Sequence, residues 1–225
     1  MTEAEWLACD EPDRLLRRSP VPLSARKRML CGIACCYRIK RLLRSGVEYE
    51  LLIRAEDFAD GEMPRDEFVD RCRVLNNITA QFPYERRQAI LAIVHLGHED
   101  IGLVFTLAAV AAAYDLTGIQ PPYGPETQEL WYSTIRQEQL HQLEFIRDIF
   151  GNPFRPVALD PSWRTETAVA LAREMYGSRD FSAMPILADA LQDAGCDSDD
   201  VLDHCRGPGP HVRGCWVVDL VLEKE

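Results

Sequence analysis

The sequence predicts an all-α protein with a multi-helix body and a small C-terminal helical module packed on it. Three observations predict this class. Apolar residues recur at the 3.6-residue period of a helix in almost every segment, as with Met29, Leu30, Ile33 and Tyr37. Capping residues precede these segments, and proline or glycine residues separate them. One short segment favours a strand by its residue types, but no second segment is suited to pair with it.

The expected helices follow one another along the whole chain. Thr2 caps the first, with Glu5 as its capping-box partner, and Ser24 caps the second after a Pro-x-Pro segment breaks the chain. Gly195 ends the helix before the last two. In order, the expected helices cover residues 2–9, 24–44, 47–60, 64–80, 83–96, 100–115, 127–150, 165–176, 182–194, 197–205 or 198–205, and 211–222.

The final segment, 211–222, is ambiguous. Its Trp216-Val217-Val218 favours a strand locally, but without a partner strand we expect a buried helix. Residues 151–157 cannot be helical, because Pro153 and Pro156 push the residues before them to extended conformations. This Pro-containing connector predicts two parts, a helical body at 1–150 and a C-terminal helical module at 151–225.

Composition and charge limit the function classes. The chain has 225 residues, of which 47% are hydrophobic, so it can bury a core. Its net charge of −11 is uneven, because residues 1–44 hold ten Lys and Arg against five acidic residues. The rest of the chain is strongly acidic, which argues against a general nucleic-acid binder, since affinity for a duplex depends on phosphate neutralisation.

Targeting and redox signals predict a cytoplasmic protein without a membrane segment. Residues 1–5 lack the basic and apolar regions of a signal peptide. The longest uncharged run, 101–114, is too short to span a bilayer and predicts a buried helix. Eight cysteines in a chain of this length, with no export signal, are expected to be free thiols.

The tail gathers the residue types of a metal site. His204, Cys205, His211 and Cys215 are potential zinc ligands around a Gly-Pro-Gly-Pro turn, and Cys196 is a further candidate. Their spacing is poor, because adjacent helical residues such as His204 and Cys205 point about 100° apart. We therefore favour a rigid corner between two packed helices, in which glycines allow positive φ and prolines stiffen the turn, and keep the metal site as a hypothesis.

Two other interpretations concern charge in the tail. Arg206, His211 and Arg213 could contact an anion or a peptide at a helix N-terminus. Asp219 lies in an apolar segment and therefore needs a partner, for which Arg206 and Arg213 are the candidates. We interpret Asp219 as part of a structural ion pair rather than as a general base.

Three segments of this chain together resemble a bacterial protein family of uncharacterised activity. They are MTEAEWLAC (1–9), RDIFGNPFRPV (147–157) and HCRGPGPHVRGCWVVD (204–219). Residues 45–145 depart from that family, whose helices there are rich in alanine and tryptophan. The resemblance implies kinship but no activity, cofactor or site.

The sequence contains no Walker loop, no Gly-x-Ser-x-Gly and no dinucleotide-binding glycine motif, so it predicts no catalytic residue and no cofactor other than a candidate zinc ion. We therefore expect a non-enzymatic protein-interaction or adaptor module with an unidentified protein partner. A zinc-binding protein or metalloenzyme that uses the tail is one alternative. The other is a nucleic-acid-associated regulator that uses the basic helix 24–44, although we interpret that helix first as offsetting the acidic body.

Overall fold

The computed structural model describes residues 1–225 except 21, 44–45, 99–100, 120–123 and 225. The described residues form twelve α-helices and no β-strand, so the all-α prediction is confirmed. The body contains α1 (Glu3–Ala8), α2 (Pro12–Arg17), α3 (Ala25–Arg38), α4 (Val47–Ala59), α5 (Arg65–Ile78), α6 (Tyr84–His95), α7 (Gly102–Thr117) and α8 (Pro125–Phe150). The chain ends with α9 (Glu166–Ser178), α10 (Met184–Asp193), α11 (Asp199–Arg206) and α12 (Trp216–Leu222). Three 3₁₀ turns cover Lys40–Leu42, Thr79–Gln81 and Pro161–Trp163.

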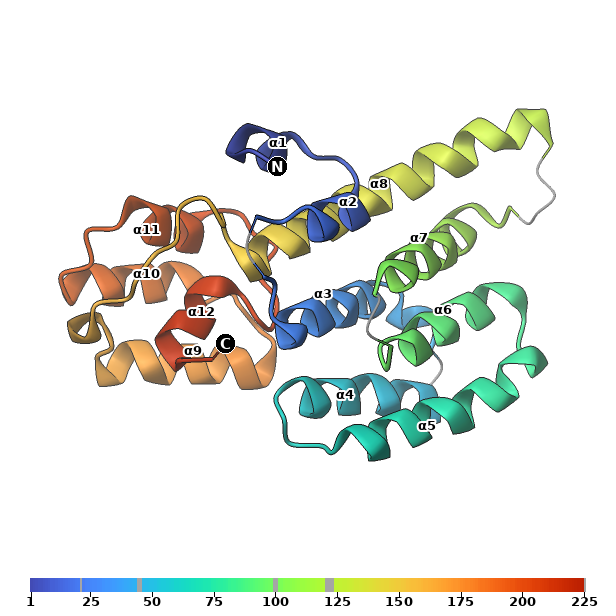
Figure 1. Ribbon diagram of the computed structural model, residues 1–225, viewed down its shortest axis with the longest axis horizontal. Helices are drawn as coiled ribbons and strands as arrows, with labels where there is room; N and C mark the ends of the chain where they lie inside the picture. Colours follow the sequence, from blue (N-terminus) through green and yellow to red (C-terminus); the bar gives the residue numbers. More distant parts are fainter. Residues whose placement is uncertain (21, 44–45, 99–100, 120–123, 225) are drawn as a thin grey trace.

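Helix α3 lies in the middle of the body and contacts α4, α6, α7 and α8 (Figure 1). Its residues from Met29 to Cys36 are all buried, because a central helix must be apolar on every side. Gly32 allows the closest approach, since a Cβ atom there would lie 2.7 Å from Leu96 Cδ2. The apolar helix α7 packs against α6 and α8. Among the described residues, no helix is both long and apolar enough to cross a membrane.

A second cluster of buried apolar side chains lies among α9, α10, α11 and α12. It includes Ala172, Leu187, Val201, Cys205 and Val217. The C-terminal end of the long helix α8 reaches this part of the molecule, and α12 contacts it (Figure 1). The larger body cluster draws its buried residues from positions 6–149. The division into residues 1–150 and 151–225 stays a prediction.

Two helix boundaries differ from the sequence-based prediction by five residues or more, and the prediction omits α2. The helix expected over 24–44 ends at Arg38, because the Ile39 amide bonds to the Cys36 carbonyl and tightens the chain into a 3₁₀ turn. The last residue of that prediction, Arg44, lies outside the described residues. The helix expected over 211–222 starts only at Trp216, because Gly214 adopts φ +94° and interrupts the helix.

Candidate metal centre

The chain turns back sharply after α11, and this corner positions the candidate site. Residues 207–215 contain a cis Gly209–Pro210 bond and two glycines with positive φ, Gly209 and Gly214. Gly214 also lies tight against α3, where a Cβ atom would come within 2.7 Å of Leu30 Cδ1. The corner thereby brings His211 and Cys215 to the last turns of α8.

Four potential ligand atoms meet there, and all lie within 4.8 Å of one another. Asp148 Oδ1 is 2.8 Å from His211 Nδ1 and 3.1 Å from His204 Nε2. Cys215 Sγ is 3.2 Å from His204 Nε2 and 3.9 Å from His211 Nδ1. They come from three helices and the corner: Asp148 from α8, His204 from α11, His211 from the turn and Cys215 from the N-cap of α12.

The site is almost closed to solvent. The side chain of Asp148 is 3% exposed and that of His211 is 8% exposed, whereas His204 retains 21%. The amide of Val212 donates to Asp148 Oδ2 at 2.9 Å and fixes the carboxylate orientation. Nε2 of His211 is buried with no partner among the described residues, so this ring is held through Nδ1.

The pKa values of Asp148 and Cys215, the two candidate ligands that can carry a negative charge, shift in opposite directions. Burial raises the pKa of Asp148, but hydrogen bonds from His204 and His211 outweigh it and hold the pKa below its ordinary value. Burial, and then the nearby charge of Asp148, raise the pKa of the Cys215 thiol well above its ordinary value. The amides of Val218 and Val217 oppose this, because the N-terminus of α12 favours negative charge.

The structure brings together three of the four residues proposed as metal ligands from the sequence. Cys205 is not among the four atoms, because its side chain is fully buried in the C-terminal apolar cluster. Its neighbour His204 points to the centre instead, as expected for adjacent residues of a helix. Cys196 also belongs to the apolar cluster.

Sequence reasoning missed Asp148. It lies 56 positions before His204, so no local motif connects the two. A signal was nevertheless present, because Asp148 lies on the buried face of α8 with Phe145 and Ile149. A carboxylate on an apolar face requires a partner, by the same argument that singled out Asp219.

The residues proposed for an anion or peptide contact have other partners. Arg206 donates to Asp189 and Gln192 on α10, at 2.9 and 2.7 Å. His211 bonds to Asp148, and Arg213 donates to Glu56 on α4 and to Asp60 at the C-cap of α4. Each of these three side chains thus already meets a carboxylate of this chain.

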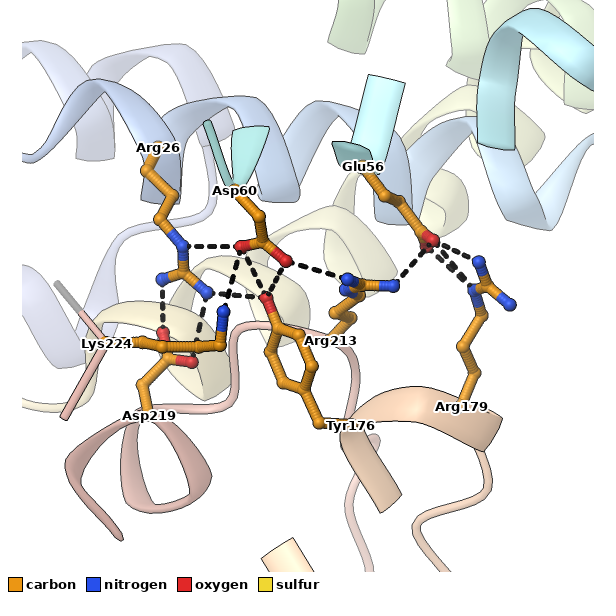
Figure 2. A network of polar contacts seen from close by, with 8 residues as sticks. All are labelled: Arg26, Glu56, Asp60, Tyr176, Arg179, Arg213, Asp219 and Lys224. Carbon is orange, nitrogen blue, oxygen red and sulfur yellow. Dashed lines mark hydrogen bonds and ion pairs between the residues drawn. The ribbon is translucent and has the colours of Figure 1, made fainter. Parts of the chain in front are cut away.

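A second set of polar residues joins the body to the C-terminal helices (Figure 2). We call it the charged network, and it comprises Arg26, Glu56, Asp60, Tyr176, Arg179, Arg213, Asp219 and Lys224. Asp60 accepts hydrogen bonds from Arg26, Tyr176 and Arg213. Glu56 accepts from Arg179 and Arg213.

The partner of Asp219 differs from both candidates named from the sequence. Arg26 of α3 donates to both of its carboxylate oxygens, at 2.7 and 3.2 Å, while Arg206 and Arg213 bind elsewhere. Sequence distance explains the error, since Arg26 lies 193 positions away.

The basic helix directs several of its cations at the chain itself. Arg26 binds Asp60 and Asp219, Arg38 binds Glu138, and Arg41 binds Asp115. These contacts agree with the interpretation that the helix offsets the acidic body. They do not support the alternative that this helix binds nucleic acid.

The fold and the site together define an all-α protein with an Asp-His-His-Cys cluster at a helix corner. A comparison of the chain with models of protein families, with curated proteins and with solved structures finds no match.

Proposed function

We propose that this protein binds one Zn²⁺ ion through Asp148, His204, His211 and Cys215. The convergence of these four side chains carries the proposal. In a tetrahedral zinc site with ligand bonds of about 2.0–2.3 Å, neighbouring ligand atoms are about 3.3–3.6 Å apart. Four of the six pairwise distances in this cluster, 2.8, 3.1, 3.2 and 3.9 Å, bracket that range, and all six are within 4.8 Å.

Ligand chemistry supports zinc over harder cations. Two imidazole nitrogens, one sulfur and one carboxylate oxygen form a set that suits Zn²⁺, whereas Mg²⁺ and Ca²⁺ require oxygen ligands. An ionised Asp148 and a Cys215 thiolate would balance the charge of a divalent ion in this buried site. Neutrality matters here, because uncompensated charge in a protein interior is costly.

The proposed role of the ion is structural. Four ligands from the protein complete a tetrahedron and leave no position for a substrate. The ion would fasten the end of α8 to α11, to the corner and to the start of α12. A zinc-stabilised helical module without catalysis is compatible with the adaptor function expected from the sequence, and we place it in the cytoplasm because all eight cysteines are free.

Metal analysis of the purified protein tests this proposal. We expect about one equivalent of zinc in the natural protein and less than about a tenth of an equivalent in Cys215→Ser and in Asp148→Asn. Cys205→Ala is the matched control, because it changes a buried cysteine of the same region that lies outside the cluster. Zinc that is absent from the natural protein after growth and purification with added zinc would overturn the proposal, as would equal zinc in Cys215→Ser.

A further inference from the structure

A cavity of about 640 Å³ lies beside the candidate metal centre. Helix α1, the segment before α3, the end of α8 and the connector at 151–157 surround it. His204 and Trp216 form part of its wall, and their rings contact each other with centroids 5.1 Å apart. The cavity is large enough for a small organic molecule.

The charges that line this cavity are mainly positive. Lys27, Arg147, Arg155 and Lys224 face one carboxylate, Asp200. Two of the four cations have acidic partners elsewhere, since Arg155 binds Glu3 and Lys224 binds Asp60.

The other two cations lack an anionic partner. The ammonium group of Lys27 makes no hydrogen bond or ion pair to any residue that the structure describes, and burial lowers its pKa. Arg147 donates to the carbonyls of Trp6, Leu7 and Cys9 but to no described carboxylate. Its Nε is buried without a partner among the described residues. Nearby carboxylates, Asp219 for Lys27 and Glu144 for Arg147, offset the effect of burial on the two pKa values only in part, so a bound anion would stabilise both cations further.

Most of the remaining wall is apolar. Trp6, Phe150, Trp216 and Leu220 line the cavity together with several prolines. A few charged groups on a mostly apolar wall are typical of sites for organic ligands, where the charge orients the ligand and the wall buries it. Bare inorganic anions would leave this wall uncovered.

We propose that this cavity binds an anionic small molecule with an aromatic or apolar body, whose phosphate or carboxylate group contacts Lys27 and Arg147. The body of the ligand lies against Trp216 and Phe150. This function goes beyond metal binding and does not require it, because neither cation is a ligand of the candidate centre.

The lysine content of the chain gives a direct test. The sequence has three lysines, Lys27, Lys40 and Lys224. Reductive methylation with ¹³C-formaldehyde therefore labels three side chains and the terminal amine for NMR, and Lys27→Gln assigns the signal of interest. We expect phenyl phosphate to shift the Lys27 signal in a saturable manner while the Lys40 signal stays in place. Equal or absent movement of the two signals overturns the proposal.

Calorimetry on unlabelled protein measures the contribution of the cation. Lys27→Gln should weaken phenyl phosphate binding by at least about tenfold, because it removes a charge-assisted contact. Lys40→Gln, at an exposed lysine outside this cavity, should leave binding unchanged. Equal affinity of Lys27→Gln and the natural protein contradicts the assignment.

Two further probes separate the contributions of charge and of the apolar wall. Phenol, which lacks the charge, and inorganic phosphate, which lacks the ring, should each bind more weakly than phenyl phosphate. Inorganic phosphate that binds as tightly as phenyl phosphate overturns the apolar part of the proposal. Zinc content measured on the same Lys27→Gln sample should be unchanged, so failure of this site and failure of the metal proposal are distinguishable.

Discussion

Asp60 accepts hydrogen bonds from three side chains although its own is only 1% exposed. Burial raises its pKa, but the bonds from Tyr176, Arg213 and Arg26 outweigh burial and lower the pKa from 3.8 to about 2. A lowered pKa in the folded state means that ionised Asp60 stabilises the fold above its ordinary pKa. That contribution disappears as the pH falls from about 4 towards 2.

The Asp60→Asn variant tests this at acid pH. We expect the natural protein to lose about 2 kcal/mol more stability than Asp60→Asn between pH 4.5 and pH 2, as measured by urea unfolding. Protonated histidines release a bound metal in both proteins over this pH range. The difference in stability between the two proteins therefore reports the contribution of Asp60 alone. Asp193→Asn, at an exposed position near the end of α10, is the control and should follow the natural protein. Parallel pH profiles for Asp60→Asn and the natural protein would contradict this account.

Candidate ligands could be predicted where they lie close together in the sequence. His204, His211 and Cys215 lie within twelve positions, and their types alone made them candidate metal ligands beside the interpretation of a rigid corner. Asp148 and the Arg26 partner of Asp219 were not predictable, because folding brings them from 56 and 193 positions away. A sequence can indicate that a carboxylate in an apolar segment needs a partner, but it does not indicate which residue is that partner.

At the scale of elements, the corner between α11 and α12 depends on Gly214. This residue combines φ +94° with close contact to Leu30, so both its conformation and its lack of a side chain are required. Sequence periodicity located the helices on both sides of the corner but extended the second one by five residues, to His211. The periodicity of apolar side chains does not indicate where a residue inside the pattern adopts a positive φ.

Alanine at two glycines should have opposite effects. Gly214→Ala should destabilise the fold by at least about 1–3 kcal/mol, because it adds backbone strain and a clash with Leu30. Gly177→Ala, in α9 with no atom beyond its own stretch of helix within 4 Å of the new Cβ, should stabilise it by about 0.5–1 kcal/mol. Thermal and urea unfolding of both variants measures these changes. Similar stabilities of the two variants would show that the corner is not constrained in this way.

At the scale of the whole molecule, the two larger apolar clusters are joined by polar contacts. The charged network connects α3 and α4 to α9, α12 and the corner (Figure 2). The Asp-His-His-Cys cluster connects α8 to α11 and α12. The all-α class followed from periodicity and capping, because these depend on neighbouring residues. The contacts between the clusters depend on residues far apart in the sequence, and so were not predictable.

Removal of one charge from the charged network should lower the free energy of unfolding substantially. Asp219→Asn leaves Arg26 without part of its buried counter-charge, so we expect a loss of about 3 kcal/mol in the free energy of unfolding. Asp189→Asn breaks an exposed ion pair with Arg206 and should cost less than about 1 kcal/mol. Urea unfolding at neutral pH, with equal zinc content in both samples, measures the two values. A similar small loss for both variants would mean that the ion pair of Arg26 and Asp219 contributes little to stability.

The central claim is that one zinc ion binds at the corner, and X-ray absorption at the zinc edge tests it most directly. The account predicts one sulfur at about 2.3 Å and three nitrogen or oxygen ligands at about 2.0–2.1 Å, with the sulfur lost in Cys215→Ser. Cys205→Ala should leave the spectrum unchanged. A shell of several sulfurs, or a shell with no sulfur in the natural protein, would contradict the assignment of Asp148, His204, His211 and Cys215 as the ligands.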